Sequence, residues 1–281
     1  MKDFAGKIAV VTGGGSGMGR ELVRQLAAEA CNIAMCDVSE EGMAETRRLC
    51  EAAGLPQGLR VTTHLADVSD AAQVERFRDE VAEHQGTDKI HLLFNNAGIG
   101  SGGSMFAHSR EEWERTFNVC WGGVYNCTRA FLPMLQKAEE GHIVNTSSVN
   151  GFWASVGPHI PRSRSTRARV QSGNLSDEID ARQIAQARAR IASMGRDVSS
   201  LSDDDIRKMV AERESRFRED APTSAAEAAT IILDGVKADN WRILVGNDAH
   251  QIDELVREAP ERAYDLDFFE SFAAKAGWRI P

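Results

Sequence analysis

The chain has 281 residues, of which 42% are hydrophobic and 27% are charged, and its formal net charge at pH 7 is −9. This length and composition are typical of a globular protein and argue against global disorder. The acidic balance disfavours nucleic acids and anionic membranes as partners, and no apolar run approaches the roughly 18 residues of a membrane helix. Five cysteines without a Cys-x-x-Cys pair favour a reduced, cytoplasmic protein.

The first half of the chain alternates short apolar runs with helical patterns. Strands are predicted at 7–11, 32–36, 60–65, 90–94 and 142–145, and helices at 18–30, 40–53, 71–84 and from 109 towards 137. Ser109 and Glu112 form a capping box at the start of the last of these helices. Continuous apolar strands that alternate with helices predict a parallel sheet covered on both faces. The predicted fold class is therefore α/β, with a Rossmann-like, doubly wound sheet.

The second half differs in composition. Residues 151–175 contain no acidic side chain but four arginines, and they read as an irregular loop. Helical patterns dominate 176–240, followed by a predicted last strand over 243–246 and a partly helical tail. We interpret residues 1–281 as a single Rossmann-like domain with an altered, mostly helical C-terminal half. Its parts are a nucleotide-binding part (5–150), the arginine-rich loop (151–175), a helical region (176–240), and the last strand and tail (241–281).

A glycine-rich loop joins the first strand to the first helix. Its sequence, from residue 12 to 19, is Thr-Gly-Gly-Gly-Ser-Gly-Met-Gly. In this context Gly13 allows a tight turn, Gly17 lets the backbone approach a pyrophosphate, and Gly19 lets helix and strand pack closely. Backbone N–H groups at the helix N-terminus would hold the phosphates. The predicted cofactor-binding residues here are Gly13, Ser16, Gly17, Met18 and Gly19; the alternative is a glycine-rich turn without a ligand.

Asp37 ends the second strand, 18 residues after Gly19. A carboxylate at this position can accept hydrogen bonds from an adenosine ribose and repel a 2′-phosphate. It therefore predicts NAD rather than NADP as the cofactor. The alternative is an ordinary turn residue at the end of a strand.

Together these motifs resemble the short-chain dehydrogenase/reductase family over residues 5–150. The loop matches the family's Thr-Gly-x-x-x-Gly-x-Gly spacing, residues 95–98 match its Asn-Asn-Ala-Gly motif, and residues 143–149 match the strand that carries its catalytic serine. The resemblance implies a Rossmann fold and hydride transfer between NAD(P) and an alcohol or carbonyl substrate. It implies cofactor contacts from Asp67, Val68, Asn95, Ala97 and Gly98, and catalytic-site roles for Asn118 and Ser148. Taken singly, these residues also fit turn, helix-surface and strand-end positions.

The family's Tyr-x-x-x-Lys motif has no match in the expected window, 155–169, which contains neither tyrosine nor lysine. Tyr125 is followed four residues later by Arg129, and Tyr264 by Phe268. No apolar strand ending in Pro-Gly is found between 156 and 224, and the helical region resembles the substrate lid of some members. We therefore predict that the motif's helix and the following strand are missing. That helix often forms the family's dimer interface, so homo-oligomerisation stays open.

The leading hypothesis is an NAD(P)-dependent oxidoreductase of this type that acts on a small alcohol or carbonyl substrate but is catalytically impaired. The alternatives are a non-catalytic NAD-binding protein and a defective, truncated family member. The arginine-rich loop reads as a solvated loop rather than a nucleic-acid surface. The seven histidines are scattered, so no metal site is predicted.

Overall fold

The computed structural model of the chain describes residues 1–100, 109–151, 153, 184–185, 187–188, 191–192, 197–219, 223–263 and 265–275. The chain divides into two compact units, each of which is described by itself. The first comprises Met1–Gly100, Glu114–Thr146 and Ala225–Ile243, and the second comprises Ser101–Trp113, Ser147–Ser224 and Leu244–Pro281. The interpretation of 1–281 as a single domain stays a prediction.

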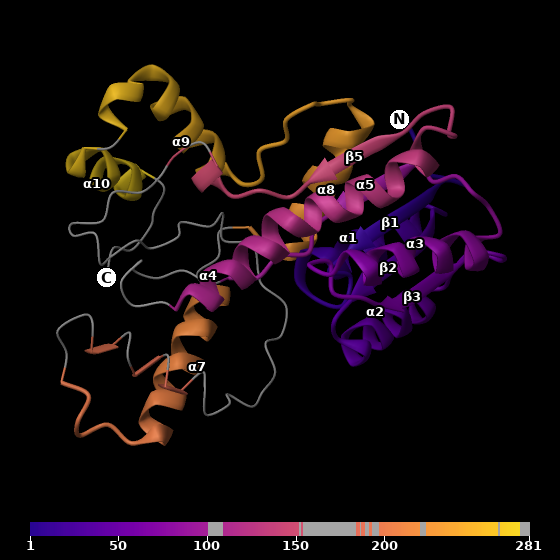
Figure 1. The fold of residues 1–281 in the computed structure, drawn as a ribbon. Coiled ribbons are helices and arrows are strands. Elements are labelled where there is room, and N and C mark those ends of the chain that lie inside the picture. Colours follow the sequence, from indigo (N-terminus) through magenta and orange to yellow (C-terminus); the bar gives the residue numbers. More distant parts are fainter. Residues whose placement is uncertain are drawn as a thin grey trace. The chain divides into compact units, whose positions relative to one another are not determined.

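The first unit is built on a parallel sheet whose five strands lie in the order β3-β2-β1-β4-β5 (Figure 1). Its strands are β1 (Ile8–Thr12), β2 (Asn32–Asp37), β3 (Val61–Leu65), β4 (Leu92–Asn95) and β5 (His142–Asn145). Its helices are α1 (Gly17–Ala28), α2 (Glu40–Ala52), α3 (Ala71–Gln85), the π-helix η1 (Asn118–Gly122), α5 (Gly123–Leu135) and α8 (Ala225–Lys237), and α4 (Arg110–Phe117) leads into η1. The chain reverses its direction of travel across the sheet between β1 and β4. This Rossmann-like order confirms the predicted fold class and places ligand binding at the carboxyl ends of these strands.

Helices cover the central strands of the sheet. Every residue of β1 is buried. Helices α3 and α5 pack against the sheet and against each other, with the rings of Phe77 and Phe131 edge to face at a centroid distance of 5.2 Å. Helix α8 packs against α1, where the Gln25 side-chain amide donates to the Ala226 carbonyl at 2.8 Å and Lys237 pairs with Glu29 at 2.7 Å. These contacts fix α8 to the first unit although it lies far from α1 in the sequence.

The second unit has a small aromatic core around Trp153. The described elements of this unit include η2 (Val149–Gly151), α7 (Asp203–Glu219), α9 (Asn247–Glu258), η4 (Pro260–Arg262) and α10 (Leu266–Lys275). The indole Nε1 donates to the Ala263 carbonyl at 2.7 Å, and the rings of Phe268 and Phe272 lie about the indole at 6.1 and 5.9 Å. This hydrogen bond satisfies the polar atom that burial of a tryptophan would otherwise leave unpaired.

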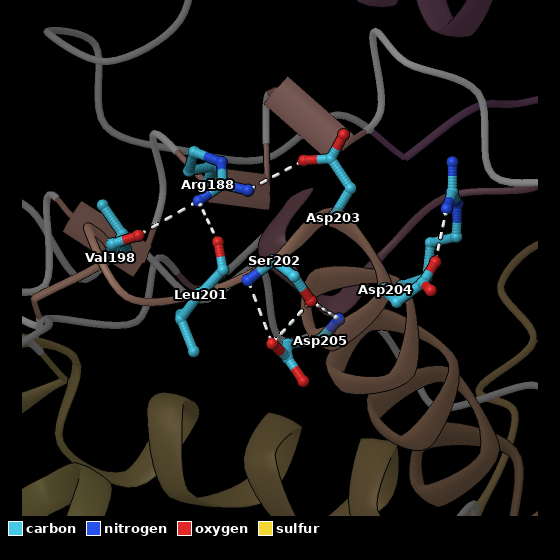
Figure 2. Close-up of polar contacts among 8 residues, drawn as sticks. Arg188, Val198, Leu201, Ser202, Asp203, Asp204 and Asp205 are labelled. Atoms are coloured by element: carbon cyan, nitrogen blue, oxygen red, sulfur yellow. Dashed lines mark hydrogen bonds and ion pairs between the residues drawn. The ribbon is translucent and has the colours of Figure 1, made fainter.

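Arg188 ties the residues before α7 to the start of that helix (Figure 2). Its guanidinium donates to the carbonyls of Val198 and Leu201 at 3.0 and 2.7 Å, and pairs with Asp203 at 2.8 Å. Ser202 and Asp205 cap the helix reciprocally, because the Asp205 amide donates to the Ser202 hydroxyl and the Ser202 amide donates to the Asp205 carboxylate. The predicted charged helix in this region is confirmed over Asp203–Glu219.

The strand expected over 243–246 does not form. Residues 243–245 lie in irregular backbone, and β5 is the last strand of the sheet among the described residues. Ile243 instead packs on α8, where a Cβ at Gly235 would lie 2.5 Å from the Ile243 Cδ1. Leu244 packs against the aromatic core of the second unit. The apolar run is therefore partly buried by helices rather than by strand pairing.

Candidate functional site

The loop after β1 has a backbone that only glycine adopts readily. Gly13 and Gly17 have positive φ angles of 70° and 53°. The Gly13 amide donates to the Cys36 carbonyl at the end of β2 at 2.8 Å. A Cβ at Gly19 would lie 2.0 Å from the Gly13 carbonyl oxygen. The loop is thus wrapped tightly against the first turn of α1, as the glycine spacing predicts.

The N-terminus of α1 presents free backbone donors. Ser16 is the N-cap residue, but its side chain makes no capping hydrogen bond, and the first turn contains no acidic side chain. The first N–H groups of a helix have no acceptor within the helix, and they attract anions together with the helix dipole. The residues present at this site therefore fit a phosphate group.

Two side chains that the sequence analysis did not single out hold the loop in place. The Arg20 guanidinium donates to the Gly15 carbonyl, and its Nε donates to the Thr46 hydroxyl at 3.0 Å. The fully buried Thr46 hydroxyl lies 2.9 Å from the Gly14 carbonyl. Neither residue belongs to a motif, and only the position of Thr46 on the inner face of α2 hints at its role. The Arg20 cation is consequently engaged within the protein.

Asp37 lies directly beside the loop. One carboxylate oxygen, Oδ2, accepts the Gly15 amide at 2.9 Å, and the other, Oδ1, accepts the Ser39 amide at 3.0 Å. The side chain is half-buried. These two hydrogen bonds fix the carboxylate at the carboxyl end of β2, next to the glycine-rich loop.

The Asn-Asn-Ala-Gly segment joins the end of β4 to its neighbours. The Asn96 and Ala97 amides donate to the Thr12 hydroxyl at 3.0 and 2.9 Å, and the Asn96 side chain donates to the Thr12 carbonyl at 3.1 Å. Thr12 thereby locks the ends of β1 and β4 together, a role that sequence reasoning missed. Ala97 lies against the loop, since a Cβ at Gly13 would come within 3.0 Å of its Cα. Gly98 follows directly in the chain.

Asn95 is buried and bridges three elements. Its amide nitrogen donates to the Thr128 hydroxyl of α5 at 3.0 Å and to the Asn145 side-chain oxygen of β5 at 2.8 Å. Its own side-chain oxygen is buried and has no hydrogen-bond partner within the described part of the chain. Part of this side chain therefore holds the fold, and the free oxygen keeps acceptor capacity.

Asp67 and Val68 follow β3. The Asp67 carboxylate accepts the amide and the hydroxyl of Ser69 at 2.9 and 2.7 Å. Val68 is buried under Gly123, where a Cβ would lie 2.6 Å from the Val68 Cγ2, and the Val68 carbonyl accepts a hydrogen bond from the Asn126 side-chain amide at 3.0 Å. This segment is thus fixed in place by its own turn and by α5.

The two predicted catalytic residues belong to different units. Asn118 is exposed and is the first residue of η1, in the long helix that continues into α5 (Figure 1). A π-turn within a helix often marks a functional position. Ser148 is half-buried in the second unit, and its carbonyl accepts the Gly151 amide at 2.8 Å. The window 155–169 and Tyr264 lie outside the described residues.

Tyr125 lies on the surface of the first unit. Its ring is exposed on α5 and stacks on Trp121 at a centroid distance of 5.9 Å. Within the described ranges, no group of three or more His, Cys, Asp or Glu side chains is placed to hold a metal ion. No described helix is long and apolar enough to cross a membrane.

Comparisons with known proteins agree with this architecture. A family model described as short chain dehydrogenase matches residues 7–159. A putative oxidoreductase, SadH, from Mycobacterium tuberculosis is 31% identical over 266 residues, which cover 92% of each chain. The meso-2,3-butanediol dehydrogenase of Serratia marcescens is 38% identical over 154 residues, which cover 55% of this chain and 58% of that one.

A solved structure shows the same fold. It is a short-chain dehydrogenase/reductase from Burkholderia phymatum in complex with NAD, which matches with a TM-score of 0.66 and 25% identity over 94% of this chain and 98% of that one. The sequence match extends over most of the chain, and the family model covers more than half of it. The chain therefore belongs to the short-chain dehydrogenase family of oxidoreductases.

Proposed function

We propose that this chain is an NAD-binding member of the family whose transfer of hydride to or from a small alcohol or carbonyl substrate is strongly impaired. The observation that carries the cofactor proposal is the Asp37 carboxylate, held 2.9 Å from the Gly15 amide of the phosphate loop. The Burkholderia phymatum relative is described in complex with NAD, which supports a nicotinamide cofactor.

Separate groups of residues would bind the different parts of the cofactor. The backbone donors at the start of α1 would hold the pyrophosphate, with Gly13, Ser16, Gly17, Met18 and Gly19 shaping the cradle. Asp37 would accept the adenosine ribose hydroxyls, and Asp67, Val68, Asn95, Ala97 and Gly98 would line the rest of the site. When bound, the nicotinamide supplies hydride chemistry.

Cofactor preference tests the role of Asp37. A 2′-phosphate beside a fixed carboxylate meets like-charge repulsion, and Arg20 is already engaged by the Gly15 carbonyl and Thr46. Calorimetric titration should show NAD binding at least about tenfold more tightly than NADP, which is about 1.4 kcal/mol.

The matched variant is Asp37→Asn, which keeps an oxygen that can accept the Gly15 amide but removes the charge. Asp37→Asn should reduce the difference in affinity between NAD and NADP, mainly by improving NADP binding. Asp37→Ala should reduce this difference as well. Tighter binding of NADP than of NAD by the unmutated protein would refute the proposal.

Impaired catalysis rests on the missing acid–base pair. A positioned general acid or base contributes about 10²–10⁴-fold to the rate, and neither Tyr125 nor Tyr264 stands four residues before a lysine. We expect oxidation of secondary alcohols, followed by NADH absorbance, to be slower than in intact relatives by at least this factor. Ser148→Ala and Asn118→Ala should change the residual rate little, because their orienting roles depend on an absent partner. Fast turnover that collapses in Ser148→Ala would show that a replacement acid exists.

The substrate class is proposed from relatives. Those with named substrates include a levodione reductase from Leifsonia aquatica and the meso-2,3-butanediol dehydrogenase, which supports small ketones and vicinal diols as first compounds to test.

The missing pair also favours the second candidate function, a non-catalytic NAD-binding protein. Thermal stabilisation by NAD without turnover would support it, and at 100 times the dissociation constant a ligand adds about 2.7 kcal/mol to the free energy of unfolding. If NAD neither stabilises the chain nor supports turnover, the remaining alternative is a defective, truncated family member.

A further inference from the structure

Two consecutive peptide groups of the glycine-rich loop are held by side chains from outside the loop. The first is the group between Gly14 and Gly15. Its carbonyl accepts the Thr46 hydroxyl of α2 at 2.9 Å, and its N–H donates to the Asp37 carboxylate of β2 at 2.9 Å. Because the C=O and N–H of a trans peptide group point in opposite directions, these two side chains fix the orientation of the group from both sides.

The second peptide group, between Gly15 and Ser16, is held by Arg20. The Arg20 guanidinium donates to the Gly15 carbonyl, so the N–H of the same group, which belongs to Ser16, points away from Arg20. Among the described residues, no backbone acceptor pairs with the Ser16 amide. Ser16 is the N-cap residue of α1, so this N–H lies at the helix N-terminus that we propose as the pyrophosphate site.

The Thr46 hydroxyl couples the two peptide groups. It accepts the Arg20 Nε at 3.0 Å, and it lies 2.9 Å from the carbonyl oxygens of both Gly14 and Gly42, although its single proton can serve only one of them at a time. The Gly42 carbonyl already accepts the Thr46 amide within α2. No backbone donor among the described residues reaches the buried Gly14 carbonyl. The proton is therefore worth most to Gly14, which would otherwise be left unpaired.

The first turn of α2 leaves just enough space for the loop. A Cβ at Gly42 would lie 2.9 Å from the Gly15 carbonyl oxygen, and a Cβ at Gly15 would lie 2.9 Å from the Asp37 carboxylate. Both distances are shorter than a real Cβ contact. The loop, α2 and the end of β2 are thus packed against one another at these two peptide groups, which have little room to rotate while their side-chain partners are in place.

We propose that Thr46 and Arg20 are positioning residues that set the cofactor preference of this site, an inference that rests on the proposed binding of NAD. Neither side chain needs to touch the cofactor. Thr46 orients the first peptide group so that its N–H holds the Asp37 carboxylate in place for the ribose. Arg20 orients the second so that the Ser16 N–H stays available at the start of α1. The two act as one unit, because the Arg20 Nε donates to the Thr46 hydroxyl.

Amide exchange in the full-length chain tests this arrangement without a cofactor. Thr46→Val replaces the hydroxyl by a methyl group and removes the donor to Gly14. The Gly15 amide should then exchange about tenfold faster, which is the scale of one lost hydrogen bond, because its peptide group can turn away from Asp37. The Gly13 amide, bonded to the Cys36 carbonyl at 2.8 Å, should keep its rate. Thr46→Ser keeps the hydroxyl and should keep the slow exchange at Gly15. An unchanged Gly15 rate in Thr46→Val overturns the proposal.

Calorimetric titration measures the consequence for the cofactor. In Thr46→Val, NAD should bind about tenfold more weakly, whereas NADP, which the fixed carboxylate repels, should lose less, so that the ratio of the two affinities falls at least about threefold. Thr62→Val on β3 is the matched control, because the Thr62 hydroxyl bonds instead to the Ile33 carbonyl at 3.3 Å and the His64 ring at 2.9 Å. An unchanged ratio in Thr46→Val, or an equal fall in Thr62→Val, overturns the proposal.

A double variant tests whether the two residues act as one unit. Arg20→Met should also weaken NAD binding, and the loss in Arg20→Met with Thr46→Val should be smaller than the two single losses combined; fully additive losses would contradict the coupling.

The two measurements separate this inference from the proposed function. If the unmutated chain binds NAD but Thr46→Val changes neither Gly15 exchange nor the affinity ratio, the proposed function stands and this inference fails. If the unmutated chain binds neither dinucleotide, the proposed function fails and the cofactor preference fails with it, even where Gly15 exchange responds to Thr46→Val.

Discussion

Gly19→Ala is the sharpest test of the tight packing in the glycine-rich loop, residues 12–19. The added Cβ would lie 2.0 Å from the Gly13 carbonyl oxygen and 2.6 Å from the Asn96 side-chain nitrogen, whereas real Cβ atoms essentially never approach within 3.0 Å. The loop or α1 must therefore shift by about 1 Å, and Gly13 is held by the Cys36 carbonyl at 2.8 Å. Overpacking typically costs about 1–3 kcal/mol, and a contact with a backbone oxygen as short as 2.0 Å places this substitution near the upper end of that range. The higher helix propensity of alanine offsets at most about 1 kcal/mol of this loss of stability.

The expected net loss is about 1–2 kcal/mol, or a fall in Tm of roughly 2–8 °C for a chain of this size. The same shift moves the donors at the start of α1, so NAD affinity should fall at least about tenfold. Gly122→Ala is the matched control, because its φ of −59° is helical and its nearest neighbour, the Phe117 carbonyl oxygen, is 4.0 Å away. Scanning fluorimetry and calorimetric titration measure both effects. An unchanged Tm and NAD affinity in Gly19→Ala would refute the tight wrapping of the loop.

Three further predictions concern thiols, the second core and pH. Ellman's reagent should label one thiol rapidly, at exposed Cys120, and Cys120→Ser should abolish this phase, because the other four cysteines are buried. Trp153→Phe should lower the free energy of unfolding by about 1–3 kcal/mol and speed proteolysis of the second unit, because it leaves the buried Ala263 carbonyl without its indole donor. Trp241→Phe is the control and should change little, because Trp241 is 94% exposed. Burial lowers the pKa of His64 below its usual 6.5, so the unfolded chain takes up a proton at this histidine more readily than the folded chain does. The free energy of unfolding should therefore fall as the pH drops through 6.5, and urea titrations should show a smaller fall in His64→Gln.

The first unit could be predicted closely because its signals are local. Apart from β3, whose sequence is Val-Thr-Thr-His-Leu, each strand contains a short apolar run and ends in a polar residue. The predicted strand limits agree with the structure to within two residues. The capping box at the start of α4 forms as expected, with the Ser109 amide donating to the Glu112 carboxylate at 2.9 Å. The position of the phosphate loop follows from the strand before it and the helix after it.

Tertiary contacts explain what the sequence did not reveal. The π-turn η1 leaves no local mark, since Asn118–Gly122 reads as a continuation of the helix. The roles of Thr12, Arg20 and Thr46 depend on segments that only the folded sheet brings together. The apolar run at 243–246 is ambiguous for the same reason, because a strand requires a neighbouring strand as well as a hydrophobic sequence.

This last ambiguity can be decided by hydrogen exchange. Residues 8–11 lie in the central strand β1, whose amides pair within the sheet or, at Ile8, with the His91 ring at 3.1 Å. Among the described residues, no acceptor pairs with the backbone amides of 243–245. Exchange at β1 requires global or sub-global opening, and with a stability of at least about 5 kcal/mol it should be at least about a thousandfold slower than at 243–245. Slow and equal exchange at both sites would mean that this run has found a strand partner.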